Sequence, residues 1–413
     1  MRSKPFRWMT VPLLAALAAL PVAAEVQPLG DAFRVNRTND FKQQNPVAAF
    51  SPSGTALVVW ENDQNGLRGI FQRLDGTPVS AELALVANNT LNGQYEGLVR
   101  TRKDPTVAFL SSGHFLLAWT EERAYLRSYP FFENRQVEDR EIFIQRFDAA
   151  GAPAGPRHRV NSIPGMQSVP KIAVLPDGNA VVLWKSDGPT PGRATIMARL
   201  VQGMGQPAGP EIQVTTDATA DHAAIAAGRN GFLVVWDALV NGEHDIFGRL
   251  YDTAGRSVGN DFRVSAAEGW QRWPAAAAGK DGNFLVAWHS FTTDRSIVRI
   301  HGQFVSPQGG FLGEPFRIST DEGTGQLAPA LAPTPSGGFI AAWLDWSDAG
   351  LGINAVELGA TGSRIGDEFW VSEARVQKNY RTSIAANGQG GFLIPWETIA
   401  TKRQVIVARP IGQ

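Results

Sequence analysis

The sequence predicts an all-β protein, a seven-bladed β-propeller built from four-stranded antiparallel blades. A tryptophan ends the same short apolar run seven times, at intervals of 52 to 65 residues. These residues are Trp60, Trp119, Trp184, Trp236, Trp288, Trp343 and Trp396. A turn-forming pair precedes each run, and a strand missing from the last unit is present near the N-terminus. Repeats of this length are typical of propellers or solenoids, and four strands per unit favour the propeller.

Residues 1–24 have the pattern of a cleaved export signal. Three basic residues precede an apolar stretch at 11–20, and small residues lead to a predicted cleavage between Ala24 and Glu25. The stretch is shorter than the roughly 20 residues of a membrane span. We therefore expect residues 25–413 to form a single propeller domain that is secreted or periplasmic, with no integral membrane segment in the mature chain. The sequence has 0 cysteines, so packing has to stabilise the domain without disulfides.

The charge balance argues against nucleic acid as a partner. The formal net charge of the whole chain is −1, and loss of the three basic residues in the leader would make it −4. Domains that bind nucleic acid are strongly basic. We expect no nucleic-acid partner.

Each unit is predicted to begin with two strands joined by a tight turn. The first strand opens with a proline and small apolar residues, as at 46–50 and 274–278. Pairs such as Asp177-Gly178 supply the positive φ angles that two-residue hairpin turns need. The second strand, for example residues 232–236, is apolar on both sides, which indicates that neighbouring sheets bury both of its faces.

The third and fourth strands complete the unit. The third carries a small residue and usually an arginine near its end, as in Gly248-Arg249. A glycine-containing turn then leads to a fourth strand such as residues 261–265. The seventh unit stops before this strand, whereas residues 29–36 match residues 258–265. We therefore predict that the N-terminal strand completes the last blade and closes the ring, which removes exposed sheet edges.

The repeated tryptophan is predicted to fill the space between neighbouring blades, because it follows a buried strand in every unit. Seven equivalent platforms for stacking a ligand are the alternative interpretation. The uniform repeat favours packing.

Function is expected where the units differ, since loops on a rigid scaffold carry most sites. From the repeat tryptophan to the aligned third-strand residue, the second unit has 24 residues and the others 10 to 12. The connection at 87–104 is also long, so two long loops are predicted to meet on one face. Candidate ligand contacts there are Arg100, Arg102, Arg123, Tyr125, Arg127, Tyr129 and Phe131. Aromatic rings and arginines suit an acidic glycan or a peptide, although a loop packed on itself is equally consistent.

Further candidate contacts are predicted at loops of the same face. Trp270 and Arg272 precede the fifth unit, Tyr380 and Arg381 precede the seventh, and Trp346 follows the sixth repeat tryptophan. A metal site is the less favoured interpretation of a nearby group, which comprises His222, His244, His289, Asp221, Asp237 and Asp245. We expect no metal and no cofactor.

Common enzyme motifs are absent from the sequence, including HExxH, GxSxG, the P-loop and the EF-hand calcium loop. Carboxylates directly after their tryptophans, Glu61, Asp237 and Glu397, have the side-chain type of a glycosidase pair. Ordinary surface charge is the simpler explanation.

The repeat resembles exported bacterial seven-bladed β-propeller repeat proteins. The motifs that carry the resemblance are Pro-x-Val-Ala, Asp-Gly-x-x-x-Val-x-Trp, Asp-Ile-Phe-Gly-Arg at 245–249 and Phe-Arg-Val-Asn, within residues 28–409. The resemblance implies the fold and transfers no catalytic residue. Residues 176–179 also resemble the Asp-box turn of sialidases, but they lie between the first and second strands, and seven units differ from the six blades of that family.

The leading hypothesis is an exported binding or scaffolding propeller that recognises a glycan or protein ligand through loops on one face. The alternative is an extracellular glycan hydrolase or lyase, a sialidase-like propeller enzyme, with Glu61, Asp237, His289 or Glu397 at the channel mouth. Two converging carboxylates in a deep pocket would favour the enzyme, and a shallow aromatic rim would favour binding. The oligomeric state is left open.

Overall fold

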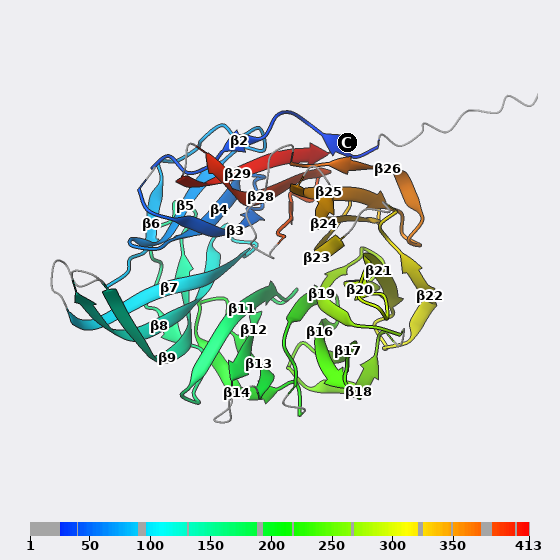
Figure 1. Cartoon of the computed structure of the whole chain (residues 1–413), viewed down its shortest axis with the longest axis horizontal. Helices are drawn as coiled ribbons and strands as arrows, with labels where there is room; N and C mark the ends of the chain where they lie inside the picture. The colour runs from blue at the N-terminus through cyan, green and yellow to red at the C-terminus, as the bar shows by residue number, and fades with distance from the viewer. Residues whose placement is uncertain are drawn as a thin grey trace, which may run out of the picture.

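The computed structural model has a β-propeller-like fold, with sheets standing side by side around a central axis (Figure 1). It describes residues 25–412 except 39, 90–95, 130–131, 188–192, 217–218, 266–267, 321–324, 348–349, 373–381 and 401–402. Every regular element within these residues is a strand. No helix in the described part is long and apolar enough to cross a membrane.

Four sheets contain four antiparallel strands each. The first consists of β3 (Gln43–Phe50), β4 (Ala56–Asn62), β5 (Gly66–Gln72) and β6 (Leu83–Val86). The next is β15 (Ala223–Gly228), β16 (Gly231–Val240), β17 (Glu243–Asp252) and β18 (Ser257–Arg263). Then come β19 (Gln271–Ala278), β20 (Phe284–Phe291), β21 (Val298–Val305) and β22 (Phe311–Arg317). The fourth is β23 (Gly325–Pro333), β24 (Phe339–Ser347), β25 (Gly350–Leu358) and β26 (Arg364–Trp370).

The second and third repeat units are joined into one eight-stranded sheet, because β11 pairs in parallel with β9 where Met166 lies beside Arg140. Its strands are β7 (Glu96–Phe109), β8 (Phe115–Tyr129), β9 (Phe132–Phe147), β10 (His158–Arg159), β11 (Met166–Val174), β12 (Ala180–Asp187), β13 (Ala194–Val201) and β14 (Pro207–Gln213).

The remaining sheet brings the two ends of the chain together. It contains β27 (Ala385–Ala386), β28 (Gly391–Ala400) and β29 (Arg403–Gly412), with β1 (Gln27–Pro28) and β2 (Phe33–Arg34) paired to β29. Phe33 lies opposite Ala408, and Asn36 Oδ1 accepts a hydrogen bond of 2.8 Å from the Ile406 amide. The blue N-terminal strand therefore lies beside the red C-terminal strand (Figure 1).

The turns between first and second strands are mostly longer than the predicted two-residue hairpins. Residues 51–55 separate β3 from β4, and Ser51 Oγ accepts the Thr55 amide at 3.1 Å while Gly54 adopts a φ of 82°. The side-chain acceptor stabilises this longer turn, so the prediction was wrong there. A two-residue connection does occur between β15 and β16, where Gly228 pairs with Gly231.

The core is distributed between sheets, as expected for a repeat architecture. Seven buried clusters are present among the described residues. Six combine strands of consecutive repeat units, and the seventh combines the first unit with the last. In β16, Val234 and Trp236 pack toward the third unit while Leu233 and Val235 pack toward the fifth. All seven repeat tryptophans are at most 3% exposed, so their predicted packing role is confirmed.

Several of these indoles are held in place by a hydrogen bond, each to its own glutamine. The Nε1 atoms of Trp60, Trp184 and Trp288 donate hydrogen bonds of 2.6, 2.9 and 2.7 Å to glutamines 17 residues earlier in the chain. Each glutamine stands three positions before the proline of the first strand, in a Gln-x-x-Pro pattern. Buried indoles need such a partner, so this repeated pair is a packing signal.

The second-unit insertion extends strands instead of forming the predicted pair of loops. Strands β7, β8 and β9 have 14, 15 and 16 residues and form a projecting arm (Figure 1). Buried Glu122 accepts hydrogen bonds from Lys103, Arg135 and Arg140 at 2.6 to 2.8 Å. Burial opposes its ionisation, but these three cations lower its pKa to about 2. Cross-strand ion pairing therefore explains why the insertion continues the sheet.

Candidate functional site

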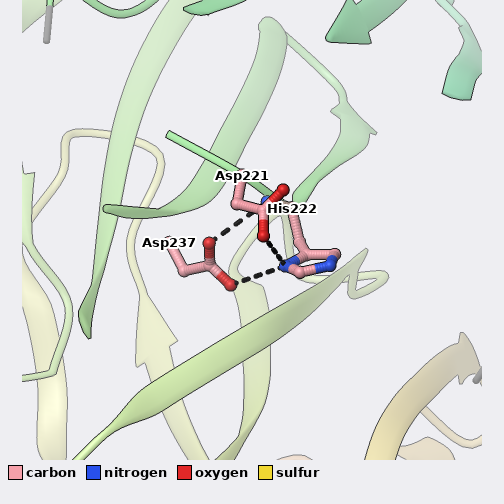
Figure 2. Close-up of side chains that lie close together, drawn as sticks. All are labelled: Asp221, His222 and Asp237. Carbon is pink, nitrogen blue, oxygen red and sulfur yellow. Dashed lines mark hydrogen bonds and ion pairs between the residues drawn. The ribbon is translucent and has the colours of Figure 1, made fainter. Parts of the chain in front are cut away.

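Two aspartates and a histidine converge where the third, fourth and fifth repeat units meet (Figure 2). Asp221 and His222 immediately precede β15, and Asp237 follows Trp236 within β16. Antiparallel pairing places these segments side by side, since the Asp237 amide donates to the His222 carbonyl at 3.0 Å. One potential ligand atom from each residue lies within 4.8 Å of the others.

Asp237 is the fixed member of this group. Its side chain is 0% exposed, and Oδ1 accepts the His222 amide at 3.1 Å. Oδ2 accepts the Trp273 amide at 2.9 Å and lies 3.0 Å from His222 Nδ1. Burial opposes ionisation of this carboxyl, but the bond to His222 and the two amides lower its pKa on balance. Asp237 is therefore an ionised acceptor at neutral pH.

Asp221 is partly exposed and forms ion pairs with two cations. Lys185 Nζ lies 2.6 Å from its Oδ1, and an Arg272 terminal nitrogen lies 2.5 Å from its Oδ2. Burial raises its pKa, but the charge of His222 and the contact with Lys185 outweigh that effect, so the pKa is lowered. The group thus balances two carboxylates with two permanent cations and a titratable imidazole.

His222 has the orientation of an acid–base group. Because Asp237 is ionised, the ring nitrogen that faces it, Nδ1, carries the proton and donates it to Oδ2. The other ring nitrogen, Nε2, points away from both carboxylates (Figure 2). The side chain is 33% exposed and lines a pocket, a setting in which an imidazole can exchange a proton with a substrate.

Two pockets adjoin this group. The histidine pocket, of about 400 Å³, is lined in part by Lys171, Lys185, Asp221, His222 and Trp273. The tryptophan pocket, of about 590 Å³, is lined in part by Trp270, Arg272, Trp273, Phe291, Arg295 and Trp346. Trp273 lines both pockets, and Arg272 reaches from the second to Asp221 of the first. The two pockets therefore combine aromatic side chains with lysines and arginines, and each pocket is lined by one histidine, His222 or His289.

The predicted ligand contacts fall into three groups. Trp270, Arg272 and Trp346 line the tryptophan pocket. In the β7–β9 arm, Arg102 is buried and lies 3.0 Å from Glu121, while Arg100 and Arg123 also face carboxylates and Tyr125 is exposed. Nothing is described of the side chains of Arg127 and Tyr129, and Phe131, Tyr380 and Arg381 lie outside the described residues. The ligand contacts in the arm remain a prediction.

The less favoured metal group is brought together only in part. Asp221, His222 and Asp237 converge, and His244 Nδ1 lies 3.9 Å from Asp237 Oδ1. Asp245 instead lies 2.6 Å from Arg263. Lys185 and Arg272 already contact the Asp221 oxygens, and a divalent cation would compete with both positive charges. This donor set fits proton transfer better than metal binding.

Four of the seven residues that follow the repeat tryptophans share a structural contact that the sequence does not reveal. Backbone amides donate to Glu397 from Asn45 at 3.3 Å, to Glu61 from Asp104 at 2.6 Å, to Asp237 from Trp273 at 2.9 Å and to His289 from Ala328 at 3.3 Å. Each donor belongs to the following unit, precedes a proline and has a φ of 50 to 54°.

This contact makes the acceptor a clamp between units. Each donor residue has a left-handed backbone conformation, which is costly for a residue other than glycine. The acceptor side chain accepts a hydrogen bond from the amide of that residue. Buried His289 accepts through Nδ1, and burial lowers its pKa to about 3, consistent with a neutral ring. The sequence signal for this contact is a polar residue directly after the repeat tryptophan, together with a residue that precedes a proline in the next unit.

Comparison with known proteins identifies the fold and no family. No family model matches the chain, and no curated protein sequence matches it. A solved protein described as of unknown function from Dyadobacter fermentans is 10% identical, with 95% of this chain and 100% of that chain covered and a TM-score of 0.52. A solved polysaccharide lyase described as an ulvan lyase bound to -[GlcA(1-4)Rha3S]- is 12% identical, with 94% and 96% covered and a TM-score of 0.54. At these identities the likeness shows a shared propeller-like fold.

Proposed function

We propose that this protein is an exported, glycan-active propeller that cleaves an acidic polysaccharide by elimination, with His222 as the proton-abstracting base. The observation that carries the proposal is the His222–Asp237 contact at 3.0 Å beside a pocket lined by Lys185. The alternative of an enzyme thus replaces pure binding as the preferred function.

Elimination is favoured over hydrolysis by the state of the two carboxylates. A glycosidase needs one carboxylic acid that stays protonated and a partner carboxylate across the scissile bond. Asp221 and Asp237 both have lowered pKa values, and Asp237 is fully buried behind three hydrogen-bond donors. Glu61 does have its pKa raised to about 7 by burial, but it is 2% exposed and holds the Asp104 amide. His222 is the better placed proton acceptor.

The proposed step needs only groups of this chain and a uronate substrate. His222 Nε2 removes the proton from the carbon next to the sugar carboxylate, and Lys185 and Arg272 stabilise the charge that develops on that carboxylate. The electron pair forms a carbon–carbon double bond while the bond from the neighbouring carbon to the glycosidic oxygen breaks. The departing oxygen takes a proton from water. Asp237 orients the imidazole and stabilises its protonated form.

The similar ulvan lyase gives this substrate class independent support. Its bound -[GlcA(1-4)Rha3S]- contains a uronic acid and a sulfate, both anionic, and its fold is shared along 94% of this chain. The cationic and aromatic side chains of the two pockets fit such a ligand.

The architecture and location are part of the same proposal. We propose that residues 1–24 are removed on export and that residues 25–413 form one domain of seven blades. The pairing of β2 with β29 supports ring closure, as does the cluster that joins Trp60 with Ile406. A secreted or periplasmic enzyme of this kind would meet polysaccharides directly.

Purified protein incubated with ulvan, alginate and pectate tests the function. We expect ultraviolet absorbance of an unsaturated uronate with at least one of these polymers, and loss of that signal in His222→Gln. His158→Gln, which changes a half-buried histidine in β10, is the matched control and should remain active. Binding of a polymer without any unsaturated product would instead support the binding protein and overturn elimination.

A further inference from the structure

Apart from Arg272, the residues that line the tryptophan pocket have no role in the proposed elimination step, yet this pocket is the larger of the two. Its aromatic side chains are Trp270, Trp273, Phe291 and Trp346, and its cations are Arg272 and Arg295. Trp346 is 39% exposed at the end of β24. Aromatic faces beside guanidinium groups can accept a sugar ring that carries an anionic substituent.

The two pockets are held in a fixed relation by one residue. Trp273 lines both, and its amide is held by Asp237 at 2.9 Å with a φ of 54°. Asp237 also holds His222. The wall of the tryptophan pocket and the imidazole are thus positioned by the same buried carboxylate, and the centres of the His222 and Trp273 rings lie 4.6 Å apart. A ligand in the tryptophan pocket can therefore extend to the imidazole.

Arg295 covers one aromatic face of the tryptophan pocket. Its guanidinium carbon lies 3.9 Å from the centre of the Trp270 ring. Arg295 is exposed in the connection between β20 and β21, where the adjacent Asp294 accepts hydrogen bonds from Ser296. Contacts of this kind are weak at exposed sites, so a sugar ring can replace the guanidinium while Arg295 turns to the anionic group of the sugar.

We propose that the tryptophan pocket is a distal subsite, which binds a sugar unit of the same chain beyond the two units that flank the bond cleaved at His222. This inference rests on the proposed glycan-lyase function. In this proposal Trp346 and Arg295 bind the distal sugar and so distinguish long chains from short ones, whereas His222 abstracts the proton. The protein therefore acts on oligomers and polymers in preference to a disaccharide.

The test compares binding of two purified ulvan fragments, a disaccharide and a longer oligosaccharide, to an inactive His222→Gln background by calorimetry. Trp346→Ala and Arg295→Ala should each weaken binding of the oligosaccharide by about tenfold and leave the disaccharide unchanged. Trp370→Ala is the matched control, because Trp370 is 40% exposed on β26 and lines neither pocket. Unaltered melting temperatures show that each variant folds.

The outcomes separate this inference from the proposed function. An oligosaccharide-specific loss in Trp346→Ala, combined with no unsaturated product from the wild-type protein, would support the subsite and overturn the lyase. Elimination that proceeds with oligosaccharide affinity unchanged in both variants would overturn the subsite alone. Equal losses for the two fragments, or no binding of either fragment, would also overturn the subsite.

Discussion

Nδ1 of His222 lies 3.0 Å from Oδ2 of Asp237, and the same oxygen accepts the Trp273 amide at 2.9 Å. One buried carboxylate therefore sets both the tautomer of the imidazole and the position of a pocket wall from the next repeat unit. In the other repeat units where this clamp is described, the acceptor is Glu61, His289 or Glu397. The candidate site is therefore built on a contact that recurs between repeat units.

Replacing Asp237 with Asn should reduce turnover far more than substrate binding. Asn removes the negative charge that stabilises the protonated imidazole, and its NH2 group replaces one of the two oxygens that now accept backbone amides. Loss of the carboxylate costs about 10²- to 10⁴-fold in kcat for an aspartate-oriented histidine. Steady-state kinetics on the polymer that proves to be cleaved measure the effect. Asp245→Asn, a buried carboxylate paired with Arg263, is the control. Equal loss in the two variants would show that the effect is general destabilisation.

The stability of the protein should depend on pH through Glu61. Burial and the nearby Asp104 raise its pKa from 4.5 to about 7. Below pH 4.5 the carboxyl is protonated in both states, and its stabilising contribution is complete. As pH rises from 4.5 to 7 the unfolded chain releases this proton while the folded chain retains it, so the free energy of unfolding falls.

The variant Glu61→Gln isolates this contribution. Since one pKa unit corresponds to about 1.4 kcal/mol, the wild type should lose on the order of 2–3 kcal/mol relative to the variant across that interval. Urea denaturation at pH 4.5, 6 and 7.5 measures the difference. A constant difference between the two proteins would mean that Glu61 titrates normally in the fold.

The Gln-x-x-Pro pattern should carry measurable stability. Gln167→Leu leaves the buried Trp184 Nε1 without the acceptor that now lies 2.9 Å away, which costs about 1–3 kcal/mol. Exposed Gln213→Leu on β14 is the control and should change the free energy of unfolding by less than about 0.5 kcal/mol. If the two variants lost similar amounts of unfolding free energy, the hydrogen bond between Trp184 and Gln167 would not stabilise the fold.

The repeated apolar strands could be predicted from the sequence, because burial of both faces requires a continuous apolar run such as residues 232–236. The extended arm could not. Its strands continue because the charges of β7, β8 and β9 pair across the sheet, as Glu122 does with Lys103, and a sequence does not reveal that register. Without that register, a long polar insertion has the sequence pattern of a loop.

The candidate site was predicted only in fragments. The sequence indicates Trp270, Arg272, Trp346 and the histidine–aspartate group by separate patterns, and their proximity depends on the inter-unit clamp. Lys185 directly follows a repeat tryptophan, and nothing in the sequence distinguishes it from the residues at the same position in other units. Its role is visible only from its contact of 2.6 Å with Asp221, a residue of the next unit.

Removal of residues 25–36 should lower the melting temperature of the whole domain. These residues supply β1 and β2 to β29, and Val35, 1% exposed, packs in the cluster that contains Trp60 and Ile406. Their loss would expose the edge of β29 and open the contact between the first and last repeat units. Differential scanning calorimetry of the truncated and full-length proteins measures the change.

Two point variants serve as references for this test of ring closure. Asn36→Leu and Asn161→Leu remove the same kind of side-chain acceptor, which holds the Ile406 amide at 2.8 Å and the Ile142 amide at 2.7 Å. Each should cost about 1–3 kcal/mol, and the truncation should cost more than either because it also removes strand pairing and apolar burial.

A peptide of residues 25–36 added to the truncated protein should raise its melting temperature by binding to the vacated edge. A truncated protein that melts like the full-length one would show that the N-terminal strands do not close the ring.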